Sequence, residues 1–185
     1  MARDIRPEIQ EPAPVRWLLA HPQAGWVWLL PRLWLGWQWL QAALGKLNDP
    51  AWTGAQAGVA LQGFIQGALQ RAQGPHAEVT GWYARFLRDV VLPNAAAWAK
   101  LVAYGEFLVG VALLAGMLTG IAAFFGSFMN FSFMLAGTSS ANPVMFAVAT
   151  ALVLAWRVAG WIGLDRWLLP LLGTPWQPGR AFRRS

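Results

Sequence analysis

Hydrophobic residues along the chain gather in four long stretches, each about the length that a helix needs to cross a bilayer. The stretches cover residues 26–45, 95–116, 118–135 and 143–163. About 20 helical residues rise ~30 Å, which matches the hydrocarbon thickness of a membrane. Because the links after the second and third stretches are short, consecutive stretches must run antiparallel. The pattern predicts an all-α integral membrane protein with a four-transmembrane-helix bundle.

The segment 47–93, between the first two stretches, has a different pattern. Apolar residues recur there at helical spacing in two sets, with polar residues on the other faces. The sets are Leu61, Phe64, Ile65, Ala68 and Leu69, and then Val79, Trp82, Tyr83, Phe86, Leu87, Val90 and Val91. Neither set is apolar enough to cross a bilayer. This long first loop is therefore predicted to hold two amphipathic helices, which lie at the interface or cap the bundle and end before Pro93 and Asn94.

Two polar tails flank the predicted membrane domain, residues 26–163. Residues 1–25 are rich in proline and charge, with Val15–Ala20 as a candidate interfacial helix, and residues 164–185 form a C-terminal tail. The tails hold seven arginines: Arg3, Arg6, Arg16, Arg166, Arg180, Arg183 and Arg184. The long loop and its borders hold five basic residues: Lys46, Arg71, Arg85, Arg88 and Lys100. Basic residues favour the cytoplasmic side, so we expect a multi-pass protein of the cell membrane with both termini in the cytoplasm.

The composition supports the lipid bilayer as the chain's main partner. Apolar residues make up 57% of the 185 residues and charged residues 12%, about half the charge share of a typical soluble domain. Thirteen tryptophans against two tyrosines suit a membrane interface. The net charge is +6, but the arginines gather at the two ends rather than along one face, which argues against a nucleic-acid partner.

Three ionisable residues inside the predicted spans are the candidate catalytic residues. Burying a charge in hydrocarbon is costly unless the charge is paired. Glu106 in the second span is therefore predicted to form an intramembrane charge cluster with Arg32, Arg157 or both. Two interpretations of this cluster stay open. It is either a structural ion pair that fixes helix register or a site for a proton or a quinone headgroup.

Other residues are candidates for binding. Lys46 and Lys100, at the outer ends of the first two spans, could attract an anionic substrate. Trp39 lies deeper than an aromatic belt requires, which favours core packing or stacking against a quinone. Asn130, in the third span, is expected to make an interhelical hydrogen bond.

The residues that would bind a metal or haem firmly are sparse. The chain has no cysteine, which excludes disulfides, thiolate zinc sites and iron–sulfur clusters held by this chain alone. His21 and His76 are far apart in sequence and flank membrane segments, so they are not placed to hold a haem between helices. No metal ligand set and no covalently bound cofactor is predicted. Any redox chemistry would use a diffusible cofactor such as quinone or a centre in a partner.

Several stretches resemble a known family. They are LLPRLWLGWQWLQAALGKLNDPAW (29–52), LVAYGEFLVGVALLAGMLTGIAAFFGSFMNFSFMLAGTSSANP (101–143) and GLDRWLLPLLGTPW (163–176). The chain resembles the DoxX family and, more narrowly, its DoxD branch, the small membrane subunit of thiosulfate:quinone oxidoreductase. The resemblance implies a four-helix membrane fold and oxidation of thiosulfate to tetrathionate, with electrons passed to quinone. It also implies a DoxA-like partner subunit and marks Arg32, Lys46 and Glu106 as family motif residues.

Three functions are compatible with these observations. The first is a membrane subunit of a quinone-linked oxidoreductase of the thiosulfate:quinone type. The second is a non-catalytic accessory or assembly subunit of a larger respiratory or photosynthetic membrane complex, which the sparse ligand set favours. The third is a small transporter, which four spans without an evident inverted repeat make the least favoured.

Overall fold

The computed structural model describes residues 11–173, and every regular element in that range is helical. The α-helices are α1 (Ala13–Ala20), α2 (Gly25–Leu47), α3 (Val59–Arg71), α4 (Gly81–Phe86), α5 (Ala95–Ala115), α6 (Thr119–Leu135), α7 (Asn142–Leu154) and α8 (Asp165–Leu172). Short 3₁₀ helices occupy η1 (Pro22–Ala24) and η3 (Leu92–Asn94), and a π-helical turn, η2, occupies Leu87–Val91. The all-α prediction is confirmed for this part of the chain.

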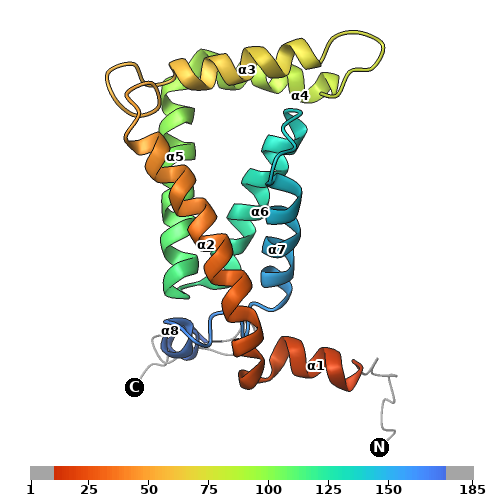
Figure 1. The fold of residues 1–185 in the computed structure, drawn as a ribbon, viewed down its shortest axis with the longest axis vertical. Helices are drawn as coiled ribbons and strands as arrows, with labels where there is room; N and C mark the ends of the chain where they lie inside the picture. The colour runs from red at the N-terminus through yellow and green to blue at the C-terminus, as the bar shows by residue number, and fades with distance from the viewer. Residues whose placement is uncertain (1–10, 174–185) are drawn as a thin grey trace, which may run out of the picture.

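Helices α2, α5, α6 and α7 run along the long axis of the molecule (Figure 1). Helix α2 packs along α5, and α6 packs along α7, while α5 also contacts α6 and α2 also contacts α7. Gly116 ends α5 in the left-handed region, with φ +64°, which lets the chain reverse within three residues before α6. Helices α3 and α4 cross one end of this bundle, and α1 and α8 lie at the other end (Figure 1).

One helical run in the described residues is both long and apolar enough to cross a membrane. It extends over Gly81–Ala115 and contains an 18-residue window of mean hydropathy 1.5. Helices α6 and α7 are apolar but shorter, with 17 and 13 residues. Helix α2 has 23 residues, but Arg32 and two glutamines lower its hydropathy.

The bundle carries its large apolar side chains on the outside. Leu108 on α5 is 66% exposed and Phe128 on α6 is 59% exposed. Helices α2, α5, α6 and α7 expose further apolar residues: Leu30, Trp34, Trp37, Leu101, Tyr104, Ile121, Phe124, Phe125, Phe131, Val144 and Leu154. A soluble monomer rarely exposes a continuous apolar surface of this kind. The outer surface of the bundle therefore suits an apolar surrounding.

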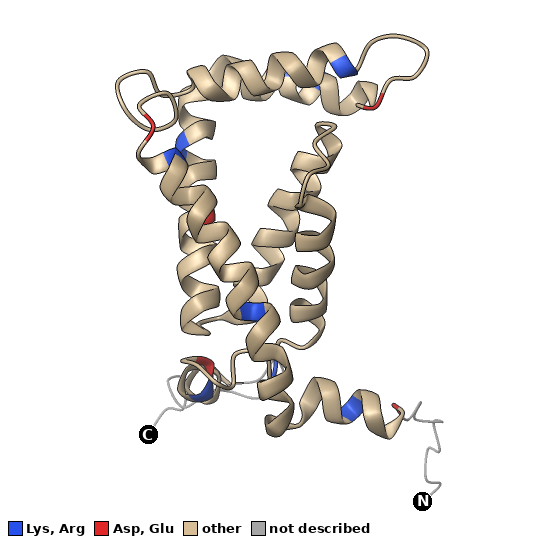
Figure 2. Ribbon diagram, in the orientation of Figure 1, with Lys and Arg blue, Asp and Glu red and all other residues tan. Residues whose placement is uncertain are grey.

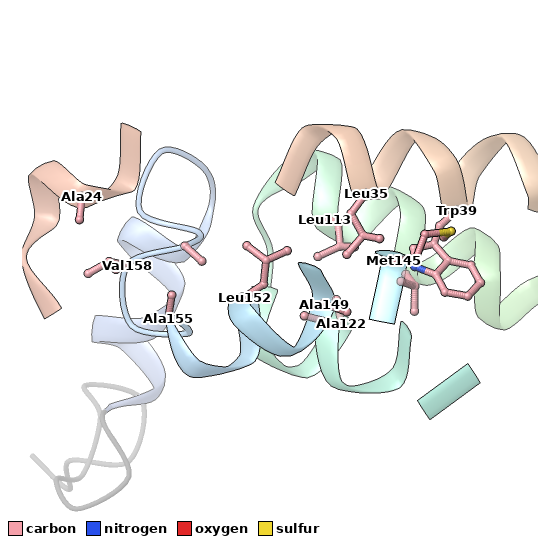
Figure 3. Packing of buried hydrophobic residues seen from close by; sticks show 13 residues of the cluster. Ala24, Leu35, Trp39, Leu113, Ala122, Met145, Ala149, Leu152, Ala155 and Val158 are labelled. Atoms are coloured by element: carbon pink, nitrogen blue, oxygen red, sulfur yellow. The ribbon is translucent and has the colours of Figure 1, made fainter. Parts of the chain in front are cut away.

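Alanines make up nearly half of the buried core of the bundle (Figure 3). Its core combines Leu35, Trp39, Leu113 and Leu152 with a set of alanines: Ala24, Ala122, Ala123, Ala149, Ala155 and Ala159. Small side chains let helix backbones approach closely, which is the usual packing between helices in membranes.

The two amphipathic helices predicted in segment 47–93 are present as α3 and as α4 with η2. Their apolar faces form a second core, which includes Leu61, Ile65, Ala68, Val79 and Tyr83. The helical run changes direction at Leu92–Asn94, at the predicted boundary before α5 (Figure 1). Two hydrogen bonds tie this layer to the end of α6. Arg71 Nη2 donates to the Ala136 carbonyl at 2.9 Å, and the Tyr83 hydroxyl donates to the Ser132 carbonyl at 2.9 Å.

The ends of the chain differ in part from the sequence pattern. Helix α1 contains the predicted interfacial segment, whereas residues 1–10 and 174–185 of the predicted tails lie outside the described residues. The helix predicted to reach residue 163 ends at Leu154, and the chain continues in turns. Backbone N–H groups of Leu164 and Asp165 bond instead to the carbonyls of Ala115 and Gly116, which fixes this segment against the end of α5. Helix α8 follows, within the predicted C-terminal tail.

Asp165 connects α8 to the start of α6, and its removal should cost measurable stability. Its buried carboxylate accepts hydrogen bonds from the backbone N–H groups of Leu118 at 2.6 Å and Thr119 at 2.9 Å. Because a buried donor and a half-buried donor would lose a charged acceptor, Asp165→Ala is expected to lower the free energy of unfolding by about 2 kcal/mol. Thermal unfolding in detergent, followed by circular dichroism, measures the loss. An equal loss in Asp89→Ala, which removes an exposed carboxylate, would contradict this account.

Candidate functional site

Glu106 is a buried carboxylate at the contact between α2 and α5. The side chain is 1% exposed, and its Oε2 accepts a hydrogen bond from Lys46 Nζ at 2.7 Å. Lys46 lies in the last turn of α2 and keeps 20% of its side chain exposed, and its ammonium also lies 5.1 Å from the centre of the Trp52 ring. The antiparallel packing of α2 on α5 brings these residues together although 60 positions separate them. The result is an ion pair inside the bundle, in which Lys46 lies near the end of the bundle and Glu106 lies deeper.

The predicted pairing of Glu106 with Arg32 or Arg157 is wrong. Arg32 lies 14 residues before Lys46, which places it ~21 Å along α2 from the level at which Glu106 finds its cation. The cation that pairs with Glu106 has to come from near the C-terminal end of α2, because the part of α5 that leads up to Glu106 packs against that end. Arg157 is exposed, and its guanidinium lies 5.6 Å from the centre of the Trp156 ring. The three predicted residues therefore do not form one cluster.

Arg32 binds backbone carbonyls rather than a carboxylate. Nη1 donates to Leu113 O at 2.7 Å and Leu114 O at 3.4 Å, and Nη2 donates to Ile162 O at 2.6 Å. The last carbonyls of a helix lack partners within the helix and carry partial negative charge, so a buried guanidinium is stabilised there. Arg32 thus joins α2 to the end of α5 and to the turns after α7.

Two further polar side chains are buried close to the level of Glu106. Trp39 Nε1, and both Nδ2 and Oδ1 of Asn130, have no hydrogen-bond partner among the described residues. A Cβ added at Gly126 would lie 3.0 Å from Trp39 Nε1 and 3.2 Å from Val109 Cγ1, so α2, α5 and α6 meet at this point. The hydrogen bond expected for Asn130 is therefore not made within residues 11–173.

Helix geometry brings Asn130 and Glu106 to the same level. Glu106 lies three residues from Val109 on α5, and Asn130 lies four residues from Gly126 on α6. Both steps are about one helical turn, and because α5 and α6 run antiparallel, both lead in the same direction. The two residues therefore lie one turn from the Trp39 contact. We call Lys46, Glu106, Trp39 and Asn130 the interior polar set.

The other sequence candidates lie apart from this set. Lys100 is exposed on α5, and the structure brings it to none of the four. Lys46 is neutralised by Glu106, so it is less suited to attract a free anion than the sequence indicates. Within residues 11–173, no group of three His, Asp or Glu side chains lies close enough together to hold a metal ion.

The interior polar set combines an ionisable pair with two donors and an acceptor that find no partner in the described part of the chain. Unpaired buried polar groups cost free energy, most of all in apolar surroundings, so such a set is suited to bind a small polar group. Asn130 was recognisable in the sequence only as a lone amide in an apolar helix, because its level relative to Glu106 depends on the helix pairing. No family model, curated protein or solved structure matches this chain.

Proposed function

We propose that the chain is a multi-pass membrane protein in which α2, α5, α6 and α7 form a four-span bundle with both termini in the cytoplasm. The exposed apolar side chains on these helices support this placement, because lipid removes the cost of exposing them. At 1.5 Å per residue, α2 and α5 are about 34 and 32 Å long, and α6 about 26 Å. Helix α7 is about 20 Å long, and residues 155–164 extend its crossing.

The turns after α7 are compatible with a membrane position. Ala155, Val158 and Ala159 are buried in the core of the bundle. Irregular backbone is tolerated at membrane depth where protein covers it. The amphipathic helices α3 and α4 then lie along the outer interface, and α1 and α8 along the cytoplasmic interface.

Within this placement, we propose that the protein is the membrane subunit of a quinone-linked oxidoreductase, as its resemblance to the DoxX family and DoxD branch implies. The observation that carries this proposal is the buried Glu106–Lys46 pair, together with donors that have no partner among residues 11–173. Ionisable residues inside a membrane are rare and mark functional sites, including proton relays. Lys46, partly exposed at the end of α2, gives the pair a connection to water.

The chemistry of a quinone headgroup fits the interior polar set. A quinone carbonyl accepts hydrogen bonds, and Trp39 Nε1 and Asn130 Nδ2 are two donors without another partner in the described residues. Reduction to quinol takes up two electrons and two protons. Glu106 would pass protons, and a DoxA-like partner would deliver electrons as two thiosulfate ions join to form tetrathionate.

A non-catalytic accessory or assembly subunit is the second candidate. Arg32 and Asp165 favour it, since both buried charges bind backbone groups and hold helices together. The Glu106–Lys46 pair could act in the same way. Co-purification with large redox subunits of a respiratory or photosynthetic complex would support this candidate.

Glu106→Gln separates the two candidates. The amide keeps the size of the side chain but cannot exchange a proton, so thiosulfate-dependent quinone reduction with a DoxA-like partner should fall about 100-fold. Size-exclusion chromatography in mild detergent should still show a folded protein. Glu78→Gln, at an exposed glutamate in the long loop, is the matched control and should keep full activity. Full turnover in Glu106→Gln would reject the catalytic role and leave the accessory function.

A further inference from the structure

A second site lies at the other end of the bundle, where η1, the start of α2 and the start of α8 meet. A cavity of about 590 Å³ opens there. Its lining residues are Pro22, Gln23, Trp26, Ala115, Trp161, Ile162, Gly163, Leu164, Arg166 and Trp167. Among the lining residues that the structure describes, three are tryptophans and Arg166 is the only ionisable one. None belongs to the interior polar set.

The side chains of this cavity combine apolar surface with a single cation. Trp26 is 68% exposed and Trp167 is 66% exposed, so both indoles stand at the surface. Tryptophan is enriched where lipid headgroups meet acyl chains, because its ring is apolar and its N–H can donate a hydrogen bond. Arg166 presents a planar fork of donors that matches a phosphate group.

The carboxylate next to Arg166 in sequence is directed elsewhere. Asp165 is buried and accepts from the N–H groups of Leu118 and Thr119 at the start of α6. It belongs to the lining of a different, smaller cavity of about 340 Å³. The cavity at Arg166 therefore has a positive character that suits an anionic ligand.

The position of the cavity identifies the class of that ligand. Helices α1 and α8 lie at this end of the molecule, and each carries one basic residue, Arg16 on α1 and Arg166 on α8 (Figures 1 and 2). Given the membrane placement proposed above, this end faces the cytoplasmic leaflet, whose anionic lipids attract such residues. We propose that the cavity binds one anionic glycerophospholipid, with its phosphate at Arg166 and its glycerol and upper acyl chains against Trp26, Trp161 and Trp167.

Native mass spectrometry of the detergent-solubilised full chain tests this site. The protein is incubated with phosphatidylglycerol or with phosphatidylcholine of the same acyl chains. One arginine near a membrane surface contributes about a fivefold preference for anionic lipid, so retained phosphatidylglycerol should exceed phosphatidylcholine about fivefold. Arg166→Gln should abolish that preference, and Arg166→Lys should keep most of it.

Arg16→Gln is the matched control, since Arg16 lies on α1 at the same end but does not line the cavity. It should leave the preference within about twofold of its original value, because only a general surface charge is removed. Equal losses in Arg16→Gln and Arg166→Gln would overturn the site, as would a lack of any preference in the unchanged protein. Displacement of phosphatidylglycerol by millimolar inorganic phosphate would identify a free-anion site instead. Recovery of the chain in the aqueous fraction without detergent would reject the membrane placement itself, which is a separate failure.

Discussion

Replacing Lys46 by methionine should lower the free energy of unfolding by about 3 kcal/mol, because the buried carboxylate of Glu106 would lose its cation. Methionine keeps the length and the apolar stem of lysine, so packing against Trp52 changes little. The value lies at the low end for a broken buried pair, since Lys46 keeps 20% exposure and water can reach the gap. Titration with a denaturing detergent, followed by circular dichroism, measures the difference.

The control for this prediction is Lys100→Met, which removes the same charge from an exposed position of α5. It should change stability by less than about 0.5 kcal/mol, as is usual for surface substitutions. The double variant Lys46→Met with Glu106→Leu should recover most of the loss, because an apolar pair needs no compensation. If Lys46→Met and Lys100→Met behaved alike, the pair would contribute nothing to stability.

The elements of the fold could be predicted well from the sequence where the hydrophobic period was long and uninterrupted. The amphipathic helices of segment 47–93 follow from apolar residues that recur every three or four positions, and that pattern is local. The boundary before α5 follows from Pro93, which has no N–H to donate. These features depend on a few neighbouring residues, so no knowledge of the tertiary packing was needed.

The ion pair could not be predicted in the same way. The sequence shows which residues are charged, but the partner of Glu106 depends on how far α2 is shifted along α5. A shift of two turns moves a residue by ~11 Å, more than a side chain can span. The sequence places Lys46 at the outer end of the first predicted span. The tight approach of the two helices nevertheless allows its side chain to reach inward.

The early end of α7 also depends on tertiary contacts that the local sequence does not show. Apart from Arg157, its sequence remains apolar to residue 163, so the local pattern predicts a helix throughout. Hydrogen bonds from Leu164 and Asp165 to the end of α5 favour turns instead, and Gly160 permits them because a Cβ there would collide with Asp165 and Thr119. Ala115, Gly116 and Thr119 are distant in sequence from this segment, and only the assembled bundle brings them to it.

The shift of α2 along α5 is itself fixed by two glycines. A Cβ added at Gly110 would lie 2.7 Å from the backbone nitrogen of Leu40 and 3.1 Å from the carbonyl oxygen of Gly36. A Cβ added at Gly36 would lie 3.0 Å from the backbone nitrogen of Leu114. Since these neighbours are backbone atoms, no side-chain rotation can relieve the contact. A side chain at either position would therefore push the two helices apart.

Gly110→Ala should therefore lower the free energy of unfolding by about 3 kcal/mol, the upper end of the range for an overpacked core. To fit the methyl group, α2 must move away from α5, which also stretches the Lys46–Glu106 ion pair and the hydrogen bond from Arg32 to Leu113.

Gly105→Ala is the control on the same helix, because the nearest atom to its added Cβ is Met129 Sδ at 3.6 Å, an ordinary contact. Alanine is the better helix former by about 1 kcal/mol, so Gly105→Ala should be neutral or stabilising. Detergent denaturation compares the two variants, and equal stability in both would mean that α2 and α5 do not cross at Gly110. Under the proposed function, Gly110→Ala should also lower quinone reduction, because the same movement would separate Glu106 from its cation, although residue 110 lies outside the interior polar set.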